Sequence, residues 1–546
     1  MRSQVKLWEL VRLPLSAYVL FAIGTAFIAF AWLQSYPVSI PSLDKHVFDL
    51  ISPFLWMGLS MVLASLLLIS ESSRGRMVKL LCTTSMVFFL YVHYFFFERL
   101  PGSDSHYFRA MTLLSQTAGL SPAQAAYFQW PSFFILNDII TVVAGFDIQN
   151  TSALVFIATG FALSAILFLY YSSESEGMGF AGVALYFVGL FWFLNYQFAP
   201  QSIALVLFLV CVKLVARGDF GSRICALLVF VSLVFTHAFM PVLFLLFYLI
   251  MVLLDRRRIG SFVLYSAIYL GRLVFLAVNN VRDLILILAN MQYELRLSPD
   301  YAYYLQVTLR QVPTQIDAVA QTFSRAVTLS IWLLLAAGLF IRVLRRDFGM
   351  RNLSLLLSGL FYSMIGIVVF IVGYRGFQLA FVPLASCCKA YMTKYRKLMV
   401  GFLLAVLILF PFVVVHQIYD TTLVQTASGE RASETLIHSV SGRSGSILAS
   451  REDGCYVFGR IGAIQRADLT IVPLESSDGL DLLLSRNYNY IVYGHSLEKR
   501  IVYAYGPDAP EMDRFVENYS RIWDDGSGAI LFARSSVSRF QFFPSC

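Results

Sequence analysis

Charged residues are scarce in this sequence, and their scarcity excludes most classes of soluble protein. Only 14% of the 546 residues are charged, whereas 58% are hydrophobic. The mean hydropathy is +0.70. A soluble globular chain carries about 25% charged residues. The composition therefore predicts an α-helical polytopic membrane protein.

Two further features are missing. The seven cysteines show no metal-binding spacing. Only Cys455 and Cys546 fall in the polar tail, and the sequence leaves open whether they form a disulfide. No small-residue cleavage site follows the first apolar run, residues 13–33, so we interpret this run as an uncleaved signal-anchor. The net charge of +8 comes from short basic clusters between apolar runs. This pattern is typical of membrane orientation and speaks against nucleic acid as a partner.

The apolar runs predict the membrane topology. A helix needs about 20 residues to cross the hydrocarbon core, and the sequence offers about 13 such runs. They lie at residues 13–33, 50–70, 78–97, 152–171, 179–195, 201–217, 223–238, 240–254, 261–279, 326–343, 353–373, 376–391 and 398–416.

Residues 132–149 are ambiguous, because this apolar run also carries Asp138 and Asp147. If the run does not cross and the N-terminus is cytoplasmic, about 20 basic residues lie inside and about 8 outside. If it crosses, the basic clusters at 256–258 and 345–346 fall outside. We therefore predict a re-entrant or interfacial segment in a multi-pass protein of the plasma membrane.

This topology places the unusual polar motifs on the outer face. A transporter needs polar groups at mid-depth in the membrane, so the distribution favours an outward-facing enzyme. The motifs lie in residues 98–150, 195–201, 236–237, 280–325 and 374–378.

The polar tail also lies outside in this topology. We divide the chain into a membrane module (1–416), a linker (417–450) rich in Ser, Thr and Gly, and a small extracytoplasmic α/β domain (451–546). Within the tail, Asp525-Gly526 is a tight-turn signal that predicts a hairpin. The strand-like runs are 455–458, 469–472 and 488–493, and a short helix is predicted at 507–517.

Several outer motifs together resemble the GT-C class of membrane glycosyltransferases. An outer loop carries Asp104, Tyr107 and Ala110, and the aromatic-Trp-Pro element 127–131 follows it. A Pro-Gln pair at a span entrance (200–201), a Thr-His pair at a span end (236–237) and a C-terminal outer domain complete the likeness. The likeness covers roughly residues 1–416.

The resemblance implies a many-helix module that uses sugars carried on polyprenyl phosphate and transfers them with inversion. The acceptor would be a hydroxyl of a glycan, a lipid or a protein. The family's usual catalytic loop follows the first span, whereas the Asp104 loop follows the third. Asp44, in the first outer loop, is therefore a rival for the catalytic position.

Asp104 suits the role of general base, because sugar transfer removes a proton from the attacking hydroxyl. His106 would assist this base or bind a metal. An ordinary helix N-cap at Ser103 or Asp104 explains the same residues without chemistry. No separate acid is needed, because a phosphate leaves well once its charge is met.

Several residues are predicted to bind the substrate. Arginine's planar fork suits phosphate oxygens, and a polar group within a span tends to be functional. Interface anchoring, headgroup contact or interhelical hydrogen bonds explain the same residues structurally. The candidates are Tyr107, Trp130, Gln201, His237, Arg272 and Arg375.

Asp104 together with Asp138 or Asp147 is an alternative site for a divalent ion, Mg²⁺ or Mn²⁺, because carboxylate oxygens suit such ions. No spacing signature supports this alternative. Three rival functions also stay open. A lipid-linked glycan ligase or polymerase would differ in its acceptor. A transporter or flippase would need paired charges at mid-membrane, and a scaffold would depend on the tail.

Overall fold

A computed structural model describes most of the membrane module and five short segments of the tail. For some residues, including Asp104 and Arg375, it describes the backbone alone. The described residues are 2–36, 38, 51–73, 75–97, 103–120, 126–175, 177–190, 198–276, 315–369, 373–392, 394–418, 447–449, 469–471, 490–493, 519–524 and 530–534.

A helix lies at each of the predicted spans. These helices are α1 (Arg2–Ser35), α3 (Pro53–Ser72), α4 (Arg76–Leu90), α7 (Ile148–Ser172), α8 (Met178–Gly189), α9 (Pro200–Arg217), α10 (Phe220–Thr236), α11 (Met240–Leu254), α12 (Ile259–Leu276), α15 (Gln315–Leu344), α16 (Met350–Val369), α17 (Gly373–Ala385) and α19 (Arg396–Ile418). The shorter elements are η1 (Val92–Phe96), α5 (Ser103–Ala118), η2 (Ala126–Gln129), α6 (Ser132–Ala144), η3 (Arg256–Arg258), η4 (Ser386–Cys388) and α18 (Lys389–Met392).

Within the described part of the chain, seven helical segments are long and apolar enough to cross a membrane. The protein is therefore an α-helical membrane protein. The remaining helices at predicted spans do not meet these limits, so a total of about 13 crossings stays a prediction. The seven segments are Leu15–Ser35, Pro53–Ser72, Ile148–Ser172, Pro200–Arg217, Arg256–Phe275, Thr322–Leu344 and Arg396–Val414.

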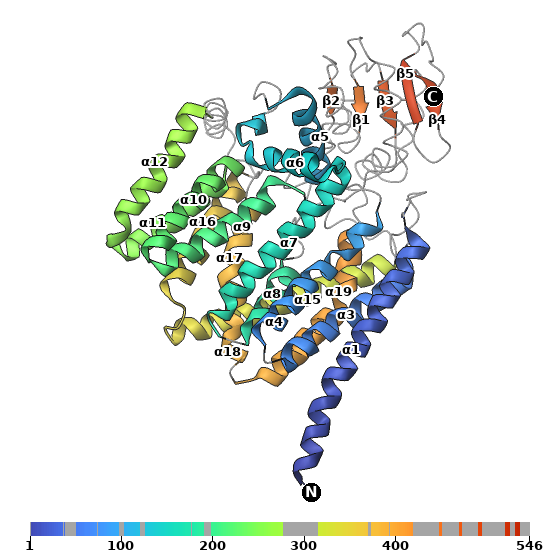
Figure 1. The fold of residues 1–546 in the computed structure, drawn as a ribbon, viewed down its shortest axis with the longest axis vertical. Coiled ribbons are helices and arrows are strands. Elements are labelled where there is room, and N and C mark those ends of the chain that lie inside the picture. Colours follow the sequence, from blue (N-terminus) through green and yellow to red (C-terminus); the bar gives the residue numbers. More distant parts are fainter. Residues whose placement is uncertain are drawn as a thin grey trace.

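Ion pairs collect several helix connections at one end of the bundle, here called the basic end. Arg396 at the start of α19 pairs with Glu71 at the end of α3, with 2.8 Å between Nη2 and Oε2. Glu174, after α7, pairs with Arg342 of α15 and Arg351 of α16. Figure 1 shows the N-terminus and α18 toward this end, and α5, α6 and the strands at the opposite end. We call the opposite end the α5 end.

The segment between α4 and α7 begins and ends at the α5 end. Phe88 of α4 packs on Phe161 of α7, and Tyr91, directly after the end of α4, packs on Phe156. The order of the contacts is reversed along α7, so the two helices are antiparallel. α6, which lies between them in the chain, has 13 residues and is about 20 Å long. The chain thus returns to the end at which it leaves α4, so α6 does not add a single crossing between α4 and α7.

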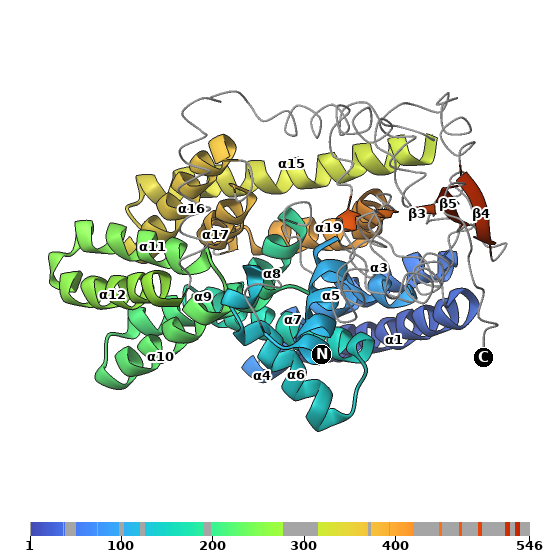
Figure 2. The ribbon, with the colours of Figure 1, turned by 90° about the horizontal axis from the view of Figure 1, so that it is seen from above.

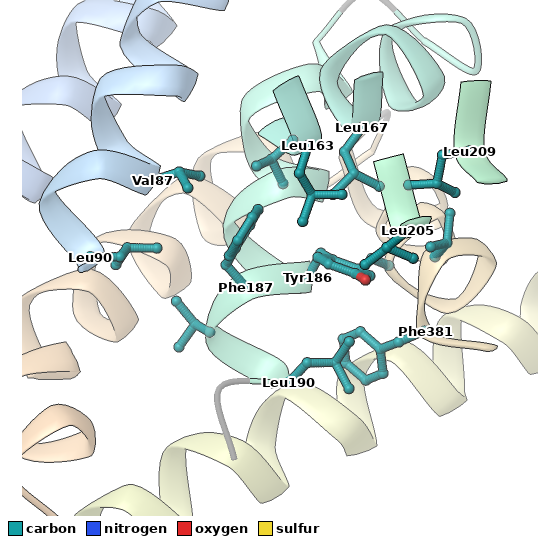
Figure 3. Packing of buried hydrophobic residues seen from close by; sticks show 14 of the residues in the cluster. Val87, Leu90, Leu163, Leu167, Tyr186, Phe187, Leu190, Leu205, Leu209 and Phe381 are labelled. Atoms are coloured by element: carbon teal, nitrogen blue, oxygen red, sulfur yellow. The ribbon is translucent and has the colours of Figure 1, made fainter. Parts of the chain in front are cut away.

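The centre of the bundle is α8, whose residues are all buried. Tyr186 and Phe187 extend from it toward different neighbours, and Tyr186 lies 6.3 Å from Phe381 of α17 between ring centroids. Figure 3 shows these rings among leucines of α7 and α9. Gly182 packs directly on the Tyr171 ring, which leaves no room for a side chain there. A helix that is apolar on every face requires such burial or lipid on all sides.

α16 and α17 cross at backbone contact. A Cβ added at Gly359 would lie 2.5 Å from the Ala380 nitrogen and 2.6 Å from the Gly376 oxygen. Both neighbours are backbone atoms, so neither can turn aside as a side chain would. Glycine at this position is therefore what lets α17 pack closely against α16.

Gly359→Ala is expected to lower the free energy of unfolding by about 1–3 kcal/mol, because the added methyl forces the two helices apart. Gly401→Ala in α19 is the matched control, since a Cβ there meets nothing within 4 Å and alanine favours a helix by up to about 1 kcal/mol over glycine. Thermal unfolding in detergent would compare the two variants. Equal melting temperatures would contradict the backbone contact.

The tail contributes a five-stranded sheet in the order β2-β1-β3-β5-β4. β1 pairs in parallel with β2 and β3, whereas β5 is antiparallel to both β3 and β4. The sheet lies at the α5 end on the side away from α10, α11 and α12 (Figures 1 and 2). The strands are β1 (Ile447–Ala449), β2 (Leu469–Ile471), β3 (Tyr490–Tyr493), β4 (Tyr519–Asp524) and β5 (Ile530–Arg534).

The strands lie partly where the sequence predicts them. β4 and β5 pair across 525–529, the segment in which Asp525-Gly526 predicts a turn. β1 falls within the predicted linker, so the sheet begins before the expected boundary at residue 451. The predicted strand at 455–458 and helix at 507–517 lie outside the described residues, as do Cys455 and Cys546.

Candidate functional site

The Asp104 motif forms the first turns of α5. Asp104, His106 and Tyr107 are helical in backbone, and their side chains lie outside the described part of the structure. Asp104 is the second residue of the helix, so its carboxyl belongs to the turn whose backbone N–H groups lack intrahelical partners. The base, assisting and substrate-binding roles of these residues remain predictions.

A hydrogen bond anchors this turn to the start of α9. The backbone N–H of Phe198 donates to Oγ of Ser105 over 3.1 Å, and both residues are buried. The Phe198 ring lies 5.0 Å from the Phe133 ring of α6. Gln201, in the first turn of α9, is also buried. The structure therefore places the predicted base and one predicted substrate residue on adjoining helix starts.

Ser105→Ala is expected to destabilise the protein by about 1–3 kcal/mol, because the buried N–H of Phe198 loses its acceptor. The matched control is Ser164→Ala in α7. Oγ of Ser164, also buried, donates within its own helix to the Phe161 carbonyl over 2.9 Å, so its loss leaves no backbone donor unpaired. Melting temperatures in detergent would test the difference, and equal losses would contradict the anchor.

The aromatic-Trp-Pro element is held by Arg272. Nη2 of Arg272, on α12, donates to the backbone carbonyl of Gln129 at the end of η2, directly before Trp130. The guanidinium also lies 4.7 Å over the Phe235 ring of α10. Trp130 is itself buried. Arg272 thus joins α12, η2 and α10 at the α5 end.

The charge of Arg272 is not balanced by a carboxylate of the described residues. The side chain is only 7% exposed, and no described Asp or Glu forms an ion pair with it. Its Nε is buried and has no hydrogen-bond partner there either. Burying a charge is costly unless it is paired. The arrangement therefore suits an anion that supplies the missing partner.

His237 ends α10 and shapes the turn into α11. Its Nδ1 accepts from the backbone N–H of Phe239 at 3.1 Å and of Met240 at 3.4 Å. An accepting Nδ1 puts the proton of the neutral ring on Nε2, an inference from the hydrogen bonds. Tyr269, one turn before Arg272 on α12, donates to the Ala238 carbonyl over 3.0 Å. The structure thus explains His237 as a turn residue, and a substrate role remains a prediction.

Polar contacts brace α5 against α6 and α7. Arg109 donates to Gln149 over 2.5 Å, and Ser115 lies 3.2 Å from both carboxylate oxygens of Asp138. Partial burial raises the pKa of Asp138, although hydrogen bonds from Ser115 and Gln116 act in the opposite direction. These contacts fix the second half of α5 on the membrane module.

The two carboxylates considered for a metal have structural partners. Asp138 binds Ser115, and Asp147 accepts from the Asn150 N–H over 2.7 Å as the N-cap of α7. Among the described residues, no three His, Cys, Asp or Glu side chains gather closely enough to hold a metal ion. The Asp104 side chain lies outside the described residues, so Mg²⁺ or Mn²⁺ at Asp104 stays a prediction.

The structure does not show the side chains of two other predicted site residues, Arg375 and Asp44. Arg375 lies at the start of α17 in backbone, with its side chain outside the described structure, and Asp44 is outside it altogether. The structure adds three residues that the sequence did not single out: Ser105, Gln129 and Phe235. Ser105 and Phe235 are common residue types in unremarkable positions, and Gln129 contributes only its backbone. No sequence signal marks them.

No protein-family model matches the chain, and no curated protein matches it. The class defined by the fold is an α-helical membrane protein in which a buried arginine, without a carboxylate partner among the described residues, lies at the end that carries the Asp104 helix.

Proposed function

We propose that the protein is a membrane glycosyltransferase of GT-C type that uses a polyprenyl-phosphate sugar as donor. The buried guanidinium of Arg272 carries the proposal, because it lacks a carboxylate partner among the described residues. A lipid phosphate supplies such a partner, and arginine binds phosphate oxygens through two parallel N–H groups. The same end of the protein bears the Asp104 helix.

In the proposed reaction, the acceptor hydroxyl oxygen attacks the anomeric carbon of the donor sugar. The bond between that carbon and the phosphate oxygen breaks, and the configuration inverts. Asp104 takes the hydroxyl proton, and the polyprenyl phosphate leaves as an anion that Arg272 stabilises. General-base catalysis of this kind contributes about 10²- to 10⁴-fold to the rate.

The proposal includes a topology. The α5 end faces outward, the basic end is cytoplasmic, and about 13 helices cross the plasma membrane. Residues 451–546, together with β1, form an extracytoplasmic α/β domain. The ion pairs that collect Arg342, Arg351 and Arg396 at the basic end support the orientation, since cytoplasmic connections are rich in Arg and Lys.

The test is sugar transfer from radiolabelled polyprenyl-phosphate sugars into membranes that hold equal amounts of each protein. Asp104→Asn is expected to lose about 10²- to 10⁴-fold of the wild-type rate. Asp255→Asn is the control, because Asp255 caps the basic η3 segment between α11 and α12 and pairs with Arg258 inside that segment.

Each outcome has a defined meaning. Transfer that survives in Asp104→Asn and fails in Asp44→Asn moves the base to the first outer loop. Transfer of a whole glycan chain, seen by product size, would replace the proposal with a ligase or polymerase. No transfer by wild type from a broad donor panel would overturn the enzyme and favour a transporter or scaffold.

A further inference from the structure

α6 turns its polar face toward the protein and its apolar face outward, the reverse of a helix on the surface of a water-soluble protein. Its polar side chains point into the protein. Asn137 is fully buried and donates to the Phe133 carbonyl over 2.7 Å. Asp138 accepts from Ser115, and Thr141 lies 3.0 Å from the Thr151 hydroxyl of α7.

The opposite face of α6 is apolar and uncovered. Val142 and Val143 are each 81% exposed, and Ile139 is 54% exposed. With Ile135 they follow one another at helical spacing, and Phe146, just after the end of the helix, is exposed as well. Leaving so many large apolar side chains in water costs about 25 cal/mol for each Å². A contiguous patch of this kind therefore marks a contact surface.

The chain geometry keeps α6 on one side of the membrane. The segment that contains it starts and ends at the same end of the bundle, because α4 and α7 are antiparallel, and Gly145 ends α6 in a left-handed conformation with a φ of 66°. Glycine takes this conformation at little cost. The chain then reverses, and Asp147 caps the long helix α7 directly afterwards. α6 is thus a short helix that folds back on a membrane-spanning one.

We propose that α6 is a re-entrant helix in the outer leaflet, with the face formed by Ile135, Ile139, Val142, Val143 and Phe146 in contact with lipid acyl chains. Continuity with α7 identifies the occupant, since α7 carries exposed Leu154 and Phe161 on a candidate membrane span. The inward polar face supports the same occupant, because hydrocarbon offers no hydrogen bonds to polar groups.

The position of α6 also determines the surroundings of α5. Hydrogen bonds tie α6 to Ser115 and Gln116 in the second half of α5. Immersion of α6 therefore sets that half of α5 beside lipid rather than open water. The inference does not depend on sugar transfer, and its test measures no activity.

Site-directed spin labelling in lipid nanodiscs tests the position of α6. The full chain is used with the accessible and tail cysteines replaced, as Cys225→Ser, Cys455→Ser and Cys546→Ser; the other described cysteines are buried. Labels are placed by Ile139→Cys and Val143→Cys. Leu228→Cys on α10 serves as the lipid reference and Arg257→Cys in η3 as the water reference, both at exposed positions.

The measured quantities are the collision rates of each label with oxygen, which concentrates in lipid, and with a water-soluble nickel complex. Both α6 labels are expected to match the Leu228 reference for oxygen and to fall several-fold below the Arg257 reference for nickel. Nickel collisions equal to the Arg257 reference would overturn the proposal and place the face in water. Low collision rates with both reagents would also overturn it, because a protein surface would then cover α6.

A charged substitution gives an independent reading if labelling disturbs the helix. Val143→Lys is expected to lower the melting temperature in nanodiscs more than Ser72→Lys, which changes an exposed residue at the end of α3, at the basic end of the bundle. A lysine in hydrocarbon is strongly unfavourable, whereas one in water is not. Equal melting temperatures of these two variants would overturn the immersion of α6.

Discussion

Replacing Glu174 with alanine is expected to lower the free energy of unfolding by about 3–5 kcal/mol, because it removes the nearer and more buried of the two carboxylates that pair with the buried charge of Arg342. Glu174 is the acceptor of Arg342 at 3.0 Å and of Arg351 at 2.9 Å. Asn352 donates to the same carboxylate over 3.2 Å. The Arg342 side chain is only 2% exposed, so water cannot replace the lost carboxylate.

The network around Glu174 holds four helices together at the basic end. Arg342 also donates to Oγ of Ser386 over 2.9 Å, which ties α15 to η4. Arg351 lies 4.3 Å over the Tyr170 ring of α7, and the Tyr170 hydroxyl donates to Asn352 over 2.5 Å. Loss of Glu174 therefore loosens α7, α15 and α16 at once.

Glu71→Ala is the matched control for this prediction. Glu71 forms an ion pair with Arg396 at the same end, but Arg396 is 54% exposed, and such surface pairs contribute about 0–1 kcal/mol. Thermal unfolding in detergent would compare the variants. A double variant, Glu174→Ala with Arg342→Met, is expected to recover stability because no charge remains buried there. Equal melting temperatures of the two single variants would contradict the network.

Arg272→Met is expected to separate function from stability. Removing a buried charge that lacks a carboxylate partner among the described residues relieves its desolvation cost, so the melting temperature should hold or rise. The rate of sugar transfer should fall by about 10- to 100-fold, because the variant loses one charge-assisted hydrogen bond, which contributes about 1.5–3 kcal/mol. Arg272→Lys keeps the charge but loses the planar fork, and its transfer rate is expected to lie between those of the wild type and Arg272→Met.

The measurement is transfer per amount of folded protein, with folding followed by size-exclusion chromatography and melting. Arg257→Met is the control, since Arg257 lies in η3 immediately before the same helix but at an exposed position. If Arg272 serves only to hold Gln129 and Phe235, its replacement would lower the melting temperature instead. Transfer per folded protein would then stay at the wild-type level, and the phosphate role would be wrong.

The helices are the part of the fold that the sequence predicts well. About 20 consecutive apolar residues are enough to require a helix, because a backbone in hydrocarbon must satisfy its hydrogen bonds internally. A helix lies at every predicted span, and α6 lies within the ambiguous run 132–149. The tail is less predictable from local pattern, since β1 lies in a stretch that composition assigns to a linker. A three-residue strand exists only through its partners.

In the candidate site, too, the sequence predicts some features and misses others. The sequence marks Arg272 as unusual, because a charge in an apolar run needs a partner. It also marks His237, whose observed partners are backbone N–H groups that no side-chain pattern reveals. Glu174 attracts no notice in the sequence, yet it is the centre of the basic-end network.

Composition and hydrophobic run length by themselves determined that this chain is a helical membrane protein and where its helices lie. Both depend on transfer of local segments from water to hydrocarbon, which each segment does largely on its own. Only the tertiary structure decided which polar groups meet, as when Arg272 reaches the Gln129 carbonyl and Glu174 binds Arg342. Those contacts join distant parts of the chain, so they follow from how the helices pack and not from any local run of residues.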